Sequence, residues 1–275
     1  MTRDAYYKAK SRERNKALDC LCVLKIVIRE KAILKHSGAK KMFHILKDEI
    51  KEMDIKMGRD KFFTLLKDNG LTCKKNKYKK PKTDSKHPFM KYNNLIKDLD
   101  IFRINQVWVS DITYIRVADK WTYLTLITDL FSRKIVGYSF AKGMSVEETT
   151  APAIKKALKF KKDNEDTILH SDRGVQYCMP KFTDKVKKKG ITFSNTQGGD
   201  PYENAVAERL NGILKYEFEL KDNFKNFKLA KDEIDKAVLL YNSKRPHWSL
   251  DLKTPDEVFF QSSPSHKEPP VPSST

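Results

Sequence analysis

The spacing of apolar residues changes from helical to strand-like about 100 residues into the chain. Before that point the pattern predicts one long charged helix over Tyr6–Leu34 and two shorter helices, from Ser37 to Ile50 and from Arg59 to Asn69. Gly70 is placed to cap the last of these. The two short helices are either a DNA-binding helix-turn-helix, with the helix at Arg59 in a major groove, or an ordinary pair of packed helices.

Beyond position 100 the pattern is that of strands. Three runs rich in β-branched and aromatic residues follow one another, separated by short turn-like stretches. They predict an antiparallel meander with strands over 107–117, 121–130 and 133–140.

Helices and strands then alternate. We expect a helix from Ser145, with Glu147 and Glu148 in its first turn, where the helix dipole favours acids. The run TILHSD is a fourth strand, Pro180–Lys189 a second helix and ITFS a fifth strand. This order predicts an α/β core, a mixed five-stranded sheet flanked by helices.

A last helix has a strong start signal, with Asp200 as N-cap, Pro201 at the first helical position and Glu203 three residues after the cap. Its apolar residues can face the core, while Glu208, Asn211, Gly212 and Lys215 share the other face.

Gly212 lacks a side chain in the middle of this helix. Glycine there costs helix stability, so it either lets a DNA backbone approach closely or is a simple irregularity.

Positive charge is concentrated at the front of the chain. The 275 residues carry a formal charge of +19, and residues 1–100 hold 27 Lys and Arg against 13 Asp and Glu. Such asymmetry favours a nucleic-acid partner, because each neutralised phosphate releases counterions. Charge alone would also fit an RNA-binding protein or one bound to a membrane surface.

The four cysteines are Cys20, Cys22, Cys73 and Cys178, and their spacing fits neither a zinc site nor a disulfide framework. Dispersed thiols are typical of a reducing compartment. The apolar run LCVLKIVI is too short to span a membrane. We therefore expect a cytoplasmic protein, associated with the nucleoid when bound to DNA.

Composition divides the chain into five parts. They are a charged amino-terminal helix (1–36), a small all-α helix-turn-helix region (37–73), a basic linker with prolines (74–98), the α/β core (99–260) and a Pro- and Ser-rich disordered tail (261–275).

Three acids are the candidate chemistry. Asp111 lies in the first predicted strand, Asp172 ends the fourth, and Glu208 lies on the last helix, with 60 and then 35 residues between them. Carboxylate oxygens suit hard cations such as Mg²⁺, which keep positions open for phosphate. The trio would therefore support metal-assisted attack on a phosphodiester.

Each acid also has an ordinary explanation. Strand alternation could point Asp111 at water, Asp172 before Gly174 could be turn chemistry, and Glu208 could belong to a charged helix surface. Only their combination favours a metal site.

Four motifs in order carry a family resemblance. WVSDITY, HSDRGVQY, PYENAVAERLNGILK and YNSKRPHWSLDLKTPDEVF closely resemble the catalytic core of retroviral-integrase-like transposases. More narrowly, they resemble the OrfB product of the bacterial insertion-sequence-three family. The similarity covers about 100 to the 250s, and Ser37–Leu71 resembles the helix-turn-helix that precedes that core.

The resemblance implies an RNase H-like fold, which agrees with the strand order above. It places Asp111, Asp172 and Glu208 on the family's catalytic Asp-Asp-Glu positions, where they would hold two Mg²⁺ or Mn²⁺ ions. The implied reaction is DNA end cleavage followed by strand transfer.

Further residues are expected to contact DNA. Lys215 falls on the basic position that follows the family's glutamate. The other candidates are Arg209, Asn211, Arg59, Lys61, Arg245 and His247.

The resemblance also implies partners: element ends and target DNA, further copies of the chain in a synaptic complex, and an upstream OrfA product, separate or fused. One segment, NTQGG, departs from the Ser-containing version common in the family.

Two rival functions share the fold, a catalytically silent DNA-binding regulator and an RNase H-type nuclease that cuts without joining.

Overall fold

The computed structural model describes residues 2–73, 92–163, 165–197 and 204–262. The chain divides into two compact units, Met1–Tyr78 and Lys79–Thr275. Most of the predicted linker and tail, and the predicted helix start at Asp200, Pro201 and Glu203, lie outside the described residues.

The first unit is helical, as the sequence predicts. Its helices are α1 (Arg3–Ile33), α2 (Ala39–Glu52) and α3 (Arg59–Asp68). One apolar cluster joins all three, with Val27, Met42 and Phe62 fully buried. Gly70 follows α3 with φ +67°, the left-handed conformation that glycine adopts without strain at a helix end.

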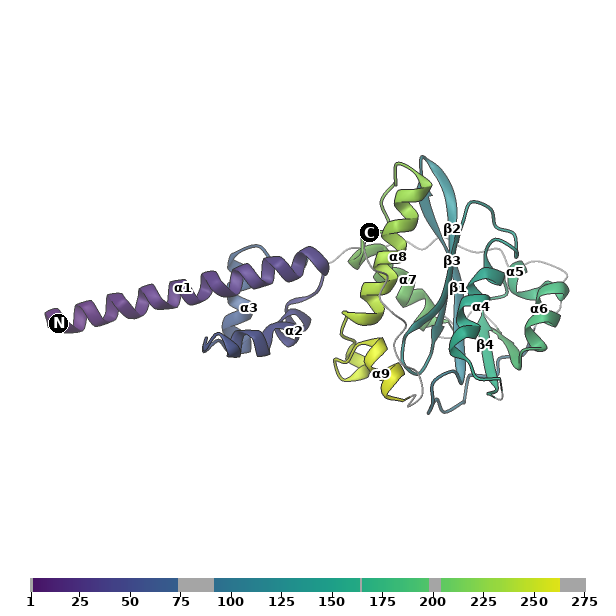
Figure 1. Ribbon diagram of the computed structural model, residues 1–275, viewed down its shortest axis with the longest axis horizontal. Helices are drawn as coiled ribbons and strands as arrows, with labels where there is room; N and C mark the ends of the chain where they lie inside the picture. Colours follow the sequence, from purple (N-terminus) through teal and green to yellow (C-terminus); the bar gives the residue numbers. More distant parts are fainter. Residues whose placement is uncertain (1, 74–91, 164, 198–203, 263–275) are drawn as a thin grey trace. The chain divides into compact units, whose positions relative to one another are not determined.

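The second unit is built on a mixed sheet (Figure 1). Its strands are β1 (Val107–Val117), β2 (Lys120–Asp129), β3 (Ile135–Ala141), β4 (Thr167–Ser171) and β5 (Ile191–Asn195). They lie in the order β3-β2-β1-β4-β5. The first three pair antiparallel, as the predicted meander requires, whereas β4 and β5 continue the sheet in parallel.

Helices cover both faces of this sheet (Figure 1). On one face lie α4 (Thr150–Ala157), α5 (Val175–Cys178) and α6 (Pro180–Lys187), with the short 3-10 helix η1 (Leu158–Phe160) after α4. On the other lie α7 (Ala205–Glu217) and α8 (Phe227–Ser243); η2 (Trp248–Leu250) and α9 (Pro255–Gln261) follow. Each face has its own apolar cluster. The predicted RNase H-like architecture is confirmed.

One predicted boundary is wrong. The helix expected from Ser145 begins only at Thr150, so Glu147 and Glu148 precede it in a turn. Pro152 explains the shift, because proline has no N–H to give to a helix and is tolerated only in the first turn. Ser145 and Glu148 instead bond to each other, with Ser145 Oγ donating to the carboxylate at 3.0 Å.

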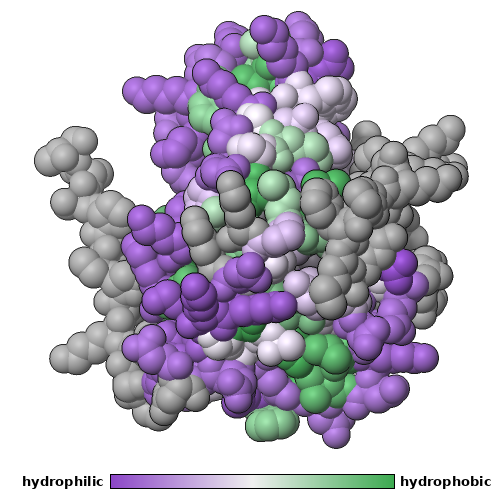
Figure 2. All heavy atoms as spheres, turned by 90° about the vertical axis from the view of Figure 1, so that its right-hand side faces the viewer, coloured by the Kyte–Doolittle hydropathy of each residue, from purple (hydrophilic) through white to green (hydrophobic). Residues whose placement is uncertain are grey.

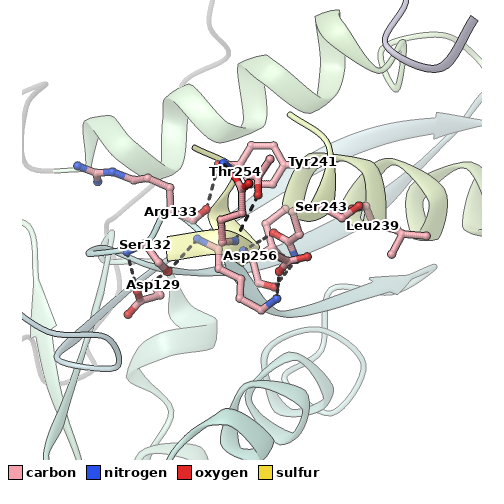
Figure 3. Close-up of polar contacts among 12 residues, drawn as sticks. Asp129, Ser132, Arg133, Leu239, Tyr241, Ser243, Thr254 and Asp256 are labelled. Atoms are coloured by element: carbon pink, nitrogen blue, oxygen red, sulfur yellow. Dashed lines mark hydrogen bonds and ion pairs between the residues drawn. The ribbon is translucent and has the colours of Figure 1, made fainter. Parts of the chain in front are cut away.

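A buried polar network fastens the β2–β3 turn to the helices behind it (Figure 3). Asp129 is fully buried and accepts hydrogen bonds from Ser132 N at 2.8 Å and Ser132 Oγ at 2.6 Å. Tyr241 of α8 donates to Arg133 O at 3.0 Å, and Lys134 pairs with Asp256 of α9. These bonds fix α8 and α9 against the sheet.

One face of the structure is largely polar. Figure 2, which views the molecule from the right-hand side of Figure 1, shows mostly hydrophilic side chains with smaller hydrophobic patches. Among the helices of the described residues, none is long and apolar enough to cross a membrane.

Candidate active site

The sheet brings the first two acids together. In the parallel pairing of β1 with β4, Ser110 lies opposite Ser171; Asp111 is the next residue of β1, and Asp172 directly follows the end of β4. Neighbouring strands are about 4.8 Å apart, and residues that continue a parallel register point to the same face. Asp111 and Asp172 are therefore neighbours.

Helix α7 supplies the third acid and two further polar groups. Leu210 and Leu214 are buried against the sheet, and Asn211 lies on the adjoining side of the helix, beside β1. Asn211 Nδ2 donates to Asp111 Oδ2 at 2.6 Å. Glu208 lies three residues earlier and Lys215 four later, so both share this side of the helix.

The electrostatics of Asp111 reflect this gathering of charge. Burial and the negative charge of Asp172 raise the pKa of Asp111 to about 7, with a smaller contribution from Glu208. Hydrogen bonds from Ile112 N and from Asn211 oppose the rise. Since like charges are costly in a partly buried site, the arrangement favours a cation or a proton.

Lys215 lies within electrostatic range of the same acid. Burial lowers the pKa of Lys215, and the negative charge of Asp111 opposes that effect. The ammonium is half-buried and faces the acids from the second turn of α7 beyond Glu208. It can meet a phosphate placed beside Asp111.

The turn that carries Asp172 is held by its own backbone. Gly174 N donates to Asp172 Oδ1 at 3.1 Å, which fixes the carboxylate. The Asp172 carbonyl accepts hydrogen bonds from Ser171 Oγ at 3.0 Å and from Asn195 Nδ2 at 3.1 Å. Asn195 ends β5, so two separate segments meet at this residue.

A buried tyrosine bonds to the residue that precedes Asp111. Tyr177 OH and Ser110 Oγ lie 2.7 Å apart, and Ser110 Oγ donates to Leu126 O, so the phenol is the donor to the serine. Burial raises the pKa of Tyr177, with Asp111 and Asp172 adding to the rise. No sequence pattern singled out Tyr177, Asn195 or Arg173 as residues near the acids. Only the position of Tyr177, five residues after Asp172, could have indicated that it lies close to the site.

The donor chemistry fits a hard divalent cation, because every acid offers oxygen. Within the described ranges, no three Asp, Glu, His or Cys side chains come close enough together to hold a metal ion. Glu208 is exposed at the first turn of α7, whereas Asp111 and Asp172 are partly buried. Asp111 and Asp172 could hold such a cation, and Glu208 is close enough to act on the charge of Asp111.

The expected DNA contacts fall into two groups. Arg209, Arg59 and Lys61 are exposed, and Arg59 pairs with its neighbour Asp60 at 2.9 Å. Asn211 is 7 % exposed and serves Asp111 instead.

Arg245 and His247 are buried in this structure. The Arg245 guanidinium holds both carboxylate oxygens of Glu217, at 2.7 and 2.6 Å, and its third nitrogen lies 2.9 Å from His247 Nε2. This arrangement argues against the direct DNA contact expected of them. They join the end of α7 to the loop that follows α8.

Two family models, each described as an integrase core domain, match residues 103–201 and 189–255. The 31 kDa protein of insertion element IS600 from Shigella sonnei is 32% identical over 212 residues, which are 76% of this chain and 78% of that protein. The transposase InsF for insertion sequence IS3A from Escherichia coli is 32% identical over 55% of this chain and 53% of its own length.

Among solved structures, the trimeric form of the HTLV-2 integrase catalytic core domain in complex with magnesium is 19% identical, with a TM-score of 0.46. The similarity covers 57% of this chain and 97% of that one. Together with its integrase core domain, the identity to insertion-element proteins shows that the chain belongs to the insertion-sequence-three family of transposases.

Proposed function

We propose that this protein is a DDE transposase that cuts the ends of an insertion sequence and joins them to another DNA, with Asp111, Asp172 and Glu208 as its catalytic acids. One observation carries the proposal. Two carboxylates directly follow the last paired residues, Ser110 and Ser171, of two parallel strands, and the pKa of Asp111 is raised to about 7 by burial and by Asp172. A site that gathers negative charge in this way is suited to binding a divalent cation.

Each residue has a distinct task. Asp111, Asp172 and Glu208 would hold Mg²⁺ or Mn²⁺, and two such ions would activate the attacking oxygen and stabilise the leaving 3′ oxygen. Asn211 fixes Asp111 through its 2.6 Å hydrogen bond. Lys215 would place positive charge beside the scissile phosphate.

The reaction needs no covalent protein intermediate. Water attacks the phosphodiester at an element end, and the bond to the 3′ oxygen breaks to leave a 3′-OH. That hydroxyl then attacks a second phosphodiester and displaces its 3′ oxygen, so one bond forms for each that breaks. The half-buried Lys215, within electrostatic range of Asp111, would hold the attacked phosphate beside that acid.

Incubating the protein with labelled element ends and Mg²⁺ or Mn²⁺ tests the proposal. Wild type should give joined products, and Asp111→Asn, Asp172→Asn or Glu208→Gln should each lower joining at least about 10³-fold, a typical loss for removal of a catalytic group. DNA binding, followed by a mobility shift, should change little. Full activity in any one variant would remove that acid from the assignment.

The same assay separates the rivals. A nuclease would give nicks without joined products, and a regulator would shift the DNA band without chemistry.

The proposed partners follow from this reaction. Two ends must be held at once, which requires further copies of the chain, and end recognition would be shared with an OrfA product, separate or fused. The protein would act in the bacterial cytoplasm on nucleoid DNA.

A further inference from the structure

One buried side chain connects the second catalytic acid to the segment by which the chain enters the core. Asn195 is 0 % exposed. Its Oδ1 accepts a hydrogen bond from Tyr92 N at 2.9 Å, and its Nδ2 donates to Asp172 O at 3.1 Å and to Ser171 Oγ at 3.3 Å. The amide has one orientation, because a flipped amide would set its oxygen against the Asp172 carbonyl and its NH₂ against the Tyr92 N–H.

The lead-in segment, Tyr92–Leu95, is fastened to β5 at further points. Leu95 N donates to Ser194 Oγ at 2.9 Å. The Tyr92 ring stacks on Phe193, with centroids 5.4 Å apart and planes inclined by 27°. This segment belongs to the second unit and precedes β1 in the sequence.

The other side of Asn195 is fastened to the Asp172 turn. Thr196 N donates to Ser171 O at 3.2 Å. Arg173 Nε donates to Thr196 O at 2.6 Å, and the same guanidinium reaches Gln197 O. Asn195, Thr196 and Gln197 are the start of the NTQGG segment that departs from the family pattern. The described part of this segment therefore lies beside the main chain of Asp172.

We infer that Asn195 is a positioning residue, which holds the main chain of Asp172 at the spacing a metal ion needs and couples that spacing to the lead-in segment. The inference rests on the proposed function. If Tyr92 N moves away, Asn195 Oδ1 is left buried without a donor, and the cheapest relief is a rotation that breaks the bond to Asp172. Displacing the lead-in segment thus loosens the site without touching any acid.

A merely structural Asn195 would only stabilise the fold, and the chain offers a matched control. Asn242 is 7 % exposed and bridges two backbone groups in the same way, with Oδ1 accepting from Ile135 N at 2.9 Å and Nδ2 donating to Ile135 O at 3.0 Å. It joins α8 to β3, away from the three acids.

The experiment compares Asn195→Ala with Asn242→Ala in the full chain. Two quantities are measured: the Mg²⁺ concentration for half-maximal end joining, and the Mg²⁺ concentration that half-saturates the rise in melting temperature, which needs no catalysis. Both variants should lower the melting temperature. Only Asn195→Ala should raise both Mg²⁺ midpoints, on the order of 10-fold, the usual effect of losing a group that orients a metal ligand. Equal midpoints in the two variants would overturn the inference.

A second pair guards against misfolding of Asn195→Ala. Tyr92→Pro removes the N–H that Asn195 accepts, whereas Tyr92→Ala removes the ring but keeps that N–H. The proline variant should raise the Mg²⁺ midpoints above those of the alanine variant; identical midpoints would contradict the coupling. Wild type and Asp172→Asn serve as references. If wild type joins no ends, the proposed function fails, while the melting-temperature midpoints still decide the role of Asn195.

Discussion

At the scale of single residues, Asp111 is the acid whose ionisation is made unfavourable by burial and by the neighbouring negative charges. An acid whose pKa rises to about 7 on folding binds more protons in the folded than in the unfolded state between about pH 4 and pH 7. Its contribution therefore lowers the free energy of unfolding as pH rises through that window. The full cost is present above pH 7.

We predict that Asp111→Asn stabilises the metal-free protein at alkaline pH. The gain over wild type should be near zero at about pH 4 and grow to at most about 4 kcal/mol above pH 7, since one pKa unit corresponds to about 1.4 kcal/mol. Denaturant unfolding in EDTA measures it. The fluorescence of Trp108, Trp121 and Trp248 reports only on the second unit, which holds every tryptophan of the chain.

Exposed Asp232 on α8, in the same unit, provides the control, and Asp232→Asn should show no such growth with pH. Saturating Mg²⁺ should remove the alkaline advantage of Asp111→Asn, because the cation stabilises only the intact site. A gain that is constant across the pH range would contradict the role given to Asp111.

Arg245 shows why a residue type alone misleads. The motif around it favours a DNA contact, yet the guanidinium is 4 % exposed and engaged by Glu217 and His247. Breaking a buried ion pair leaves an uncompensated charge, so the Arg245 guanidinium is held by Glu217 inside the fold. A sequence shows that a cation is present but does not show where its partner lies.

At the scale of elements, local patterns carry most of the fold. Alternation and β-branched runs predict all five strands, since each strand buries a continuous set of side chains. Helix α8 is not among the helices predicted from the sequence. Its apolar spacing would nevertheless have indicated a helix, because the buried residues Ile234, Ala237, Val238 and Tyr241 recur at helical intervals.

The candidate site is less predictable than the sheet. The residue types and spacing of the three acids make them recognisable in the sequence. The hydrogen bond from Tyr92 N–H to the side-chain amide of Asn195, by contrast, joins residues 103 positions apart. No periodicity encodes such a contact. The same holds for Asn211, whose place beside Asp111 depends on how α7 packs on β1.

The sequence allows two explanations for Gly212, close approach of a DNA backbone and a simple helix irregularity, and a substitution can distinguish them. Helix α7 runs through it unbroken, and a Cβ added there meets nothing within 4 Å. We predict that Gly212→Ala raises the free energy of unfolding by about 1 kcal/mol, the difference in helix propensity. End joining should nevertheless fall if the DNA backbone approaches this side of α7, which carries Glu208 and Lys215, because the added methyl group would stand between the helix and the DNA. A more stable variant with undiminished joining would make the glycine a simple irregularity.

At the scale of the whole molecule, positive charge is denser in the first unit. Met1–Tyr78 holds 21 Lys and Arg against 10 Asp and Glu, whereas Lys79–Thr275, which carries the three acids, holds 34 against 26. We propose that the first unit supplies much of the affinity for DNA and the second the chemistry. Affinity of this kind weakens steeply with salt.

The double variant Arg59→Ala with Lys61→Ala tests this division. If both side chains contact phosphate in a B-form duplex, the slope of log K against log salt should fall by about 2, close to 0.9 for each contact. Fluorescence anisotropy over a range of salt concentrations measures the slope. The control is Lys228→Ala with Lys236→Ala on the exposed side of α8, which removes the same charge from the sheet unit. Equal slopes in the two double variants would contradict helix-turn-helix binding through α3.

The register of β1 against β4 has one more consequence, for how such a protein can change over time. Because Asp111 and Asp172 extend a hydrogen-bonded ladder from Ser110 opposite Ser171, their separation is set by the spacing of two strands. The 60 residues of chain between them do not set it. Insertions in the connections of that stretch can therefore accumulate without altering the reacting geometry, whereas a slip of one residue in the ladder would turn Asp111 to the opposite face and silence the enzyme at once.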